Sequence, residues 1–154
     1  GPGSIAHGWL YALDHYIGDK LFPNIPRGQF ASRQWLTRQD AIQHPLNQRL
    51  QACYQAILLD DTGQDPSPLF QNSAKADKAA GGHYYSQPEE LCARAFEAFI
   101  QDAAVKNAFL VKGTKESEEA RLGLYPQGEQ RDRINAAFRT YFHSLGRALQ
   151  QKPA

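Results

Sequence analysis

The sequence predicts a mainly α fold, a single helical domain with long loops and at most a short strand or hairpin. Apolar residues recur every three or four positions in four separate segments, which is the spacing of amphipathic helices. Stretches rich in Pro, Gly and Ser separate these segments. A chain of 154 residues suits one domain with one core, so we expect a single domain over residues 1–154.

The first predicted helix covers about residues 4–21, with Ser4 as its N-cap. It is expected to end at a glycine that is followed by two prolines. One face carries His7, Tyr11 and Asp14, which are four and then three residues apart and therefore form a polar stripe. The residues expected to face the core are Ile5, Trp9, Ala12, Leu13, Tyr16 and Ile17.

The middle of the chain is expected to contain one helix between two connections. Residues 22–35 are predicted to be a connection, and a helix follows over about residues 36–60, with Pro45 as its start or as a kink. Residues 61–86 are rich in Ser, Pro, Gly, Asn and Lys, so a long loop is predicted there. The inward positions of the helix are Ile42, Leu46, Leu50, Cys53, Tyr54, Ile57 and Leu58.

Two further helices are predicted in the C-terminal half. One begins at Ser86, because a serine cap followed by proline and glutamate is a typical helix start, and the other covers about residues 129–150. Between them we expect an edge strand at residues 108–111 and a loop over residues 112–127. The core positions are Leu91, Ala95, Phe96, Phe99 and Ile100, then Ile134, Phe138, Tyr141, Phe142, Leu145 and Leu149.

Composition argues against several classes of function. The formal net charge of +1 gives no bulk attraction to nucleic acid or to membranes. No apolar run approaches the roughly 20 residues that span a bilayer, and no signal peptide is visible. Cys53 and Cys92 lie in apolar helical stretches, so we expect two buried thiols. The absence of methionine indicates a fragment or a processed product.

The stretch His7-Gly8-Trp9-Leu10-Tyr11 partly follows the pattern of a zinc-protease helix. Such a helix has two histidines four residues apart, so that both imidazoles reach one metal ion from one face. A glutamate directly after the first histidine is the general base for the zinc-bound water. Here only the first position is filled, so the spacing alone predicts one histidine on a helix and no metal site.

Four stretches nevertheless resemble a large polyvalent protein-associated domain of phages and conjugative elements. "GSIAHGWLYALDHYIG" resembles its Gly-Ser-(aliphatic)-Ala-His-Glu-Trp-x-His-Ala-Leu-Asp-x-Tyr stretch. "YYSQPEELCARAFEAFIQD" resembles its Pro-x-Glu-Leu-x-Ala-Arg-Ala-Phe-Glu helix, which is the most specific piece. "KNAFLV" and "LYPQGEQRDRINAAF" resemble its closing segment, whereas residues 22–80 contribute little. The family also carries Gly-x-Gly-Ser at the start, so residues 1–4 are either native or the remnant of a fusion tag.

The resemblance implies a zincin-like fold with two histidines of the first helix and a glutamate of a later helix as zinc ligands. By position, His7 matches the first ligand and Glu90 the third. Gly8 stands in place of the base and Tyr11 in place of the second histidine. Because glycine cannot accept a proton and a phenol titrates near about 10, we expect no cofactor and no peptidase activity.

The sequence leaves three possibilities for these residues: two arrangements of a site, or no site at all. In the first, Tyr11, His7 and Glu90 hydrogen-bond one another without a metal. In the second, a weakened zinc site uses His7, Glu90 and a substitute ligand. The substitutes considered are Asp14, His15 and His83. Without a site, Glu90 is expected to pair with Arg94, and Glu97 with solvent or an arginine.

The resemblance and the sequence together leave four functions open. The first is a degenerate metallopeptidase-like pseudoenzyme that binds a protein partner or supports a larger mobile-element or effector protein. The second is an active enzyme that uses His7 and Glu90 with an atypical metal or without metal. The third is a DNA-handling module based on the last helix, although mixed charges there make nucleic-acid binding by this domain alone unexpected. Its arginines are Arg131, Arg133, Arg139 and Arg147. The fourth is a bacterial effector or toxin. We expect the protein to lie in the bacterial cytoplasm or to be delivered as part of a larger protein. We expect no contact with a membrane.

Overall fold

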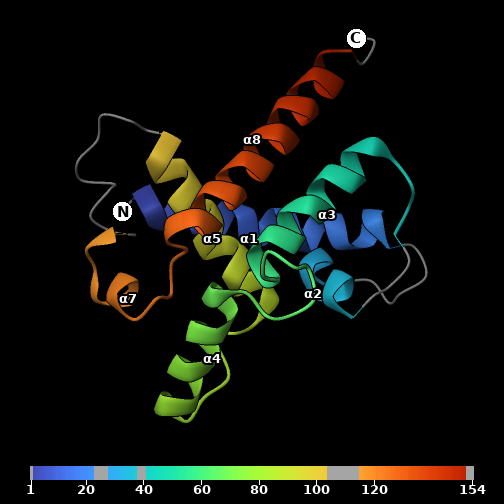
Figure 1. Ribbon diagram of the computed structural model, residues 1–154. Coiled ribbons are helices and arrows are strands. Elements are labelled where there is room, and N and C mark those ends of the chain that lie inside the picture. Colours follow the sequence, from blue (N-terminus) through green and yellow to red (C-terminus); the bar gives the residue numbers. More distant parts are fainter. Residues whose placement is uncertain (1, 23–27, 38–40, 104–114, 152–154) are drawn as a thin grey trace.

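The computed structural model describes residues 2–22, 28–37, 41–103 and 115–151. These residues are mainly helical, which confirms the predicted fold class, and they include one isolated antiparallel bridge between Leu59 and Pro66. No described helix is long and apolar enough to cross a membrane. The predicted strand at residues 108–111 lies outside the described residues. The helices are α1 (Pro2–Leu21), α2 (Ala31–Leu36), α3 (Pro45–Leu58), α4 (Pro68–Ala80), α5 (Pro88–Ala103), α7 (Glu118–Arg121) and α8 (Gly128–Gln150) (Figure 1).

Helix α5 is the centre of the fold, because residues 88–98 are all buried. Helix α1 packs along α5, α3 packs along α8, and the short helix α2 contacts both α1 and α5. Figure 1 shows the C-terminal end of α8 extending beyond the other helices and α4 projecting on the opposite side. Burying a helix on all sides brings its polar residues into the interior, where each of them needs a partner.

An aromatic cluster joins α1, α5 and α8. Phe96 of α5 stacks on Trp9 of α1 with 5.4 Å between ring centroids, and it meets Phe138 of α8 edge-on at 5.6 Å. Phe138 and Ile134 are buried as predicted. Leu149 was expected to face the core but is 60% exposed, because the C-terminal end of α8 extends beyond the other helices.

Helix α1 differs from the prediction at both of its ends. It begins at Pro2, so Ser4 lies within the helix and not at its N-cap. It also continues through Gly18, the glycine that was expected to end it, as far as Leu21. A Cβ atom at position 18 would lie 1.7 Å from the carbonyl oxygen of Gln29. Glycine is therefore needed here for the close approach of a neighbouring segment.

The buried face of α1 is also rotated from the predicted one. Ala6, Leu10 and Asp14, at four-residue spacing, are buried against the rest of the protein. Ile5, Trp9 and Tyr16 were expected in the core but are 76%, 50% and 62% exposed; Ala12 is exposed as well. The sequence pattern could not separate the two faces, because apolar residues occupy both.

Two helices lie where only connections were predicted. Helix α4 lies within the predicted loop 61–86: Ser67 caps it by accepting a hydrogen bond from the Phe70 amide, and Leu69 anchors it in the core. Its polar composition hid these signals, since a capping serine and a proline at the first position are a typical helix start. Helix α2 begins within the predicted connection 22–35, ends one residue after it, at Leu36, and is held by contacts with α1 and α5.

Three smaller expectations concern element boundaries and the thiols. The helix predicted over residues 36–60 begins at Pro45, which was one of the two roles considered for that proline; Ile42 precedes the helix and is 44% exposed. The predicted loop 112–127 contains the short helix α7, which Ser117 caps. Both cysteines are free and buried, as predicted.

Candidate functional site

The imidazole of His7 lies between two carboxylates of α5. Its Nε2 atom is 3.1 Å from Glu90 Oε2, and its Nδ1 atom is 3.7 Å from Glu97 Oε2. Glu90 and Glu97 are seven residues apart, which places them two turns apart on one side of α5. The structure thus brings His7 and Glu90 together as the sequence predicted, and it adds Glu97.

The His7 site is ionic at neutral pH. The hydrogen bond with Glu90 and the nearby carboxylate of Glu97 raise the pKa of His7 from 6.5 to about 9, against the opposing effect of burial. Burial acts to raise the pKa of Glu90, but a hydrogen bond with His7 and the nearby positive charges outweigh it and lower that pKa. The two directions agree, since each charge stabilises the other.

Neighbouring side chains fix the two carboxylates in place. The Tyr125 hydroxyl donates a hydrogen bond to Glu97 at 3.0 Å. The Tyr84 hydroxyl contributes to the lowered pKa of Glu90. The buried Arg94 has its Nη1 atom 3.8 Å from Glu90 Oε2, too far for a hydrogen bond. Its other nitrogens donate to the Leu124 and Tyr85 carbonyls and to the Ser73 hydroxyl. The expected pair of Glu90 and Arg94 is thus a long contact, and His7 is the closer partner.

Tyr11 occupies the position of the second histidine in the resembling family, but it does not join this site. It forms no hydrogen bond with His7 or Glu90 among the contacts of the described residues, and its ring meets Phe30 edge-on at 4.7 Å. Burial and the charge of Glu89 raise the pKa of Tyr11, so the phenol keeps its proton at neutral pH. The arrangement with three hydrogen-bonded residues is therefore wrong in one member, Tyr11.

Asp14 was considered as a metal ligand, but its carboxylate is committed elsewhere. It is buried and accepts hydrogen bonds from the Ser32 amide at 2.8 Å, from the Ser32 hydroxyl, and from the Tyr54 hydroxyl at 3.1 Å. Burial raises the pKa of Asp14 to about 6. Ser32 lies in the first turn of α2, so Asp14 anchors α2 to α1.

The residues around His7 do not fit a zinc ion. A zinc site of the protease type needs three protein ligands and a deprotonated imidazole nitrogen. Glu90 and Glu97 contact opposite nitrogens of the ring, so a metal at Nε2 would meet only one of them. Of the other substitutes, His15 packs on Phe30 and His83 is an exposed loop residue. Within the described ranges, no three His, Cys, Asp or Glu side chains are grouped so that they could hold a metal.

Gly8 occupies the position of the general base, and it faces open space. A Cβ atom at this position would have no neighbour within 4 Å. Packing therefore does not require glycine here, and a glutamate would fit. His7 is a poor replacement base, because an imidazole with a pKa of about 9 keeps its proton at neutral pH.

Several polar contacts of α5 were not predicted from the sequence. Arg33 of α2 forms an ion pair with the buried Glu89, and Glu97 binds Tyr125 and His7. Spacing offered one signal, since Glu90, Arg94 and Glu97 follow one another at helical intervals. Their partners could not be found, because the partners lie on other helices far along the chain.

The last helix offers less positive charge than its sequence suggests. Arg131 is 6% exposed and donates hydrogen bonds to both carboxylate oxygens of Asp102, at 2.7 and 2.9 Å. A buried and paired arginine cannot contact a phosphate backbone. Arg131 therefore gives no support to the DNA-handling hypothesis.

Comparison with known proteins adds one finding. Residues 76–149 match the family model of large polyvalent protein-associated domain 1. The match runs from the end of α4 through α5 and α8, so it includes Glu90 and Glu97 and leaves out His7. Comparisons with curated proteins and with solved structures gave no match. This part of the chain is thus similar to a domain associated with large polyvalent proteins.

Proposed function

We propose that this domain is a degenerate metallopeptidase-like module that cleaves no peptides and serves a larger protein as a protein-binding accessory part. One observation carries the proposal: the imidazole of His7 is held by Glu90 and Glu97, at 3.1 and 3.7 Å. In the resembling family, the matching histidine and glutamate are expected to bind zinc. Here the same pair forms a salt bridge between α1 and α5.

The proposal rests on two losses and one gain. Gly8 removes the base, and Tyr11 removes the second imidazole. The gain is the positive charge of His7, which makes up for the missing metal charge beside Glu90 and Glu97. Buried carboxylates need such a partner, because an unpaired buried charge is strongly unfavourable. The site is therefore stable without a metal.

A protein-binding role is supported by the exposed face of α1. Ile5, Trp9 and Tyr16 lie on one side of this helix and are at least half exposed. Large apolar side chains grouped on a surface are typical of contact sites. The match to a domain associated with large polyvalent proteins makes another part of the same polypeptide the proposed occupant.

The test is metal content and peptidase activity of the purified domain, compared with the variant Gly8→Glu/Tyr11→His. We expect neither zinc nor cleavage of an unstructured protein substrate by the original chain. The double substitution restores the base and the second ligand, so we expect it to bind one zinc ion. The matched control is Gly146→Glu/Tyr16→His, since both positions are exposed and lie outside the site.

Two results would overturn the proposal. Stoichiometric zinc together with proteolysis in the original chain would show a working enzyme. Failure of the restored variant to bind zinc, with its helical content intact, would remove the link to a metallopeptidase scaffold. The alternative enzyme without metal is less supported, because His7 holds its proton; activity that disappears in Glu90→Gln would favour it.

A further inference from the structure

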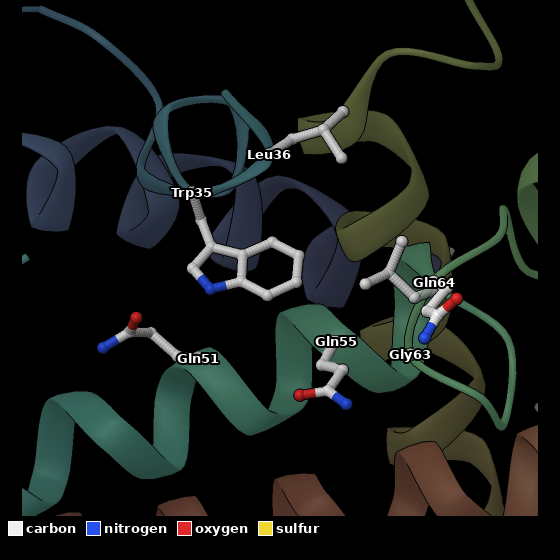
Figure 2. A pocket seen from close by; sticks show the side chains of 7 residues that line it. Trp35, Leu36, Gln51, Gln55, Gly63 and Gln64 are labelled. Atoms are coloured by element: carbon white, nitrogen blue, oxygen red, sulfur yellow. The ribbon is translucent and has the colours of Figure 1, made fainter. Parts of the chain in front are cut away.

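A cavity lies between α2, α3 and the loop after α3, and it shares no lining residue with the His7 site. Its volume is about 410 Å³ (Figure 2). Trp35 and Leu36 line it from α2, and Gly63 lies in the loop. The remaining lining residues are Gln51, Gln55, Leu59 and Gln64. A volume of this size is typical of a small-molecule site, for which about 300–1,000 Å³ is usual.

Three carboxamides line this cavity with their hydrogen-bonding groups unused. Gln51 and Gln55 are four residues apart on α3, so both positions lie on the face of α3 that lines the cavity, and Gln64 comes from the loop. None of the three side chains forms a hydrogen bond with another part of the described chain. Each amide offers both donors and an acceptor. Together they can bind a ligand that carries several groups able to donate and to accept.

The indole of Trp35 gives the cavity a flat apolar wall. Figure 2 shows the ring of Trp35 nearly face-on, between α2 and α3 and near Gln51 and Gln55. On its buried side, Trp35 lies 6.1 Å from the Tyr54 ring, which positions it. The face of an aromatic ring is negative and attracts polarised C–H groups. A ligand that presents C–H groups on one face and hydroxyls at its edge would fit this wall.

Charge near the cavity disfavours anionic ligands. None of the lining residues that the structure describes is charged. The loop that supplies Gly63 and Gln64 also carries Asp60, Asp61 and Asp65. A hydrogen bond from Thr62 lowers the pKa of Asp60, which keeps this carboxylate ionised. A phosphate or carboxylate ligand would be repelled here, whereas a neutral ligand would not.

We infer that this cavity is a binding site for a neutral saccharide. A sugar ring has C–H groups on its faces for the indole, and hydroxyls at its edge that donate to and accept from the glutamine amides. No charged group is needed. Gly63 has a positive φ of 74°, a conformation that favours glycine, and the amide of Gln55 lies beside it, 2.9 Å from where a Cβ atom would be. This inference is independent of the proposed loss of peptidase activity at His7.

The test is calorimetric and NMR titration of the whole chain with named neutral probes. The saccharide probes are glucose, galactose, mannose, N-acetylglucosamine and their β-linked disaccharides. Adenosine and a blocked alanine dipeptide represent the other neutral ligands that an indole and amides can bind. We expect at least one saccharide to bind and to shift the indole N–H signal of Trp35, with no response to the other two probes.

Variants separate this cavity from other surfaces. Gln51→Leu/Gln55→Leu removes the amides at similar volume, and Trp35→Ala removes the wall; each is expected to weaken saccharide binding about tenfold or more. The control Gln48→Leu changes an exposed glutamine of the same helix that does not line the cavity, and it should leave binding unchanged. No binding of any saccharide, binding only of adenosine or the dipeptide, or equal binding by the double variant would overturn the inference.

Discussion

Helix α1 contributes to two polar sites, a half-buried one at His7 and a buried one at Asp14, and the two sites differ in how they stabilise charge. At His7, two carboxylates face a cation, and the pKa of Glu90 is lowered. At Asp14, a carboxylate receives hydrogen bonds from Ser32 and Tyr54 and forms no ion pair with a described residue, and burial raises its pKa to about 6. Neutral donors therefore only partly offset the burial of a charge, whereas an opposite charge more than offsets it.

The same difference separates their contributions to the fold. Asp14 supplies the acceptor for three donors that are themselves buried, so α2 depends on it. His7 retains some exposure, 26% of its side chain, so water can partly replace its partners. We expect Asp14 to matter more for stability and His7 to matter more for pH dependence.

The largest effect is expected from Asp14→Ala. The substitution leaves the Ser32 amide, the Ser32 hydroxyl and the Tyr54 hydroxyl buried without an acceptor, which should lower the free energy of unfolding by about 3 kcal/mol or more. Urea unfolding at pH 7 measures it. Asp14→Asn keeps one acceptor oxygen and should lose much less. Equal, small losses in both variants would show that Asp14 is not the anchor of α2.

The pH dependence of stability should come next in size. Folding raises the pKa of His7 from 6.5 to about 9. The stability that protonated His7 contributes is therefore fully present below pH 6.5 and is lost as the pH rises through about 9. We expect a decrease of about 2–3 kcal/mol over this range. Urea unfolding at several pH values measures it, and His7→Gln should flatten the curve there.

Asp14 provides the internal comparison for that measurement. Its pKa is also raised by folding, from 3.8 to about 6, so the stability that it provides is lost as the pH rises through this lower range. Asp14→Asn should remove that decrease and leave the one above pH 6.5 intact. If His7→Gln leaves the alkaline decrease in place, another group is responsible for it.

A smaller effect is expected from Glu90→Gln. This change removes the negative charge nearest to His7 at similar volume, so the pKa of His7 should fall from about 9 toward 6.5. At neutral pH the loss of the ionic hydrogen bond should lower the free energy of unfolding by about 1–2 kcal/mol. NMR titration of the imidazole and urea unfolding provide the two values. An unchanged pKa of His7 would contradict the observed pairing.

The smallest effect is expected from Glu97→Gln. The Glu97 carboxylate lies 3.7 Å from Nδ1 of His7, whereas the Glu90 carboxylate lies 3.1 Å from Nε2. The Tyr125 hydroxyl can still donate a hydrogen bond to the amide oxygen of the new glutamine. The pKa of His7 should fall by less than in Glu90→Gln, and stability should change by less than about 1 kcal/mol. A larger effect than that of Glu90→Gln would reverse the order of the two partners.

The parts of the fold with strong local signals were predictable from the sequence. The helices near residues 88–103 and 128–150 have clear starts and regular apolar spacing. Helix α4 was missed because its cap, Ser67, stands in a polar stretch, and α2 was missed because contacts with other helices hold it. Local sequence cannot report such contacts.

At the site, the resemblance predicted the approach of His7 and Glu90, which spacing alone could not. The roles of Glu97 and Tyr125 depend on how α1 and the segment between α7 and α8 lie against α5, and local sequence could not predict them. The prediction that Tyr11 hydrogen-bonds to His7 and Glu90 was wrong. Tyr11 lies on the same side of α1 as His7, but its ring packs against Phe30. A residue four positions along a helix is near its partner but need not contact the same group.

The most direct test of a metal-free, ionic site is an NMR titration of the His7 imidazole, performed with and without one equivalent of zinc. We expect a pKa near 9, far above the ordinary value of 6.5, and no change of the His7 signals when zinc is added at neutral pH. A pKa at or below 6.5, or His7 signals that move with zinc, would contradict the site described above.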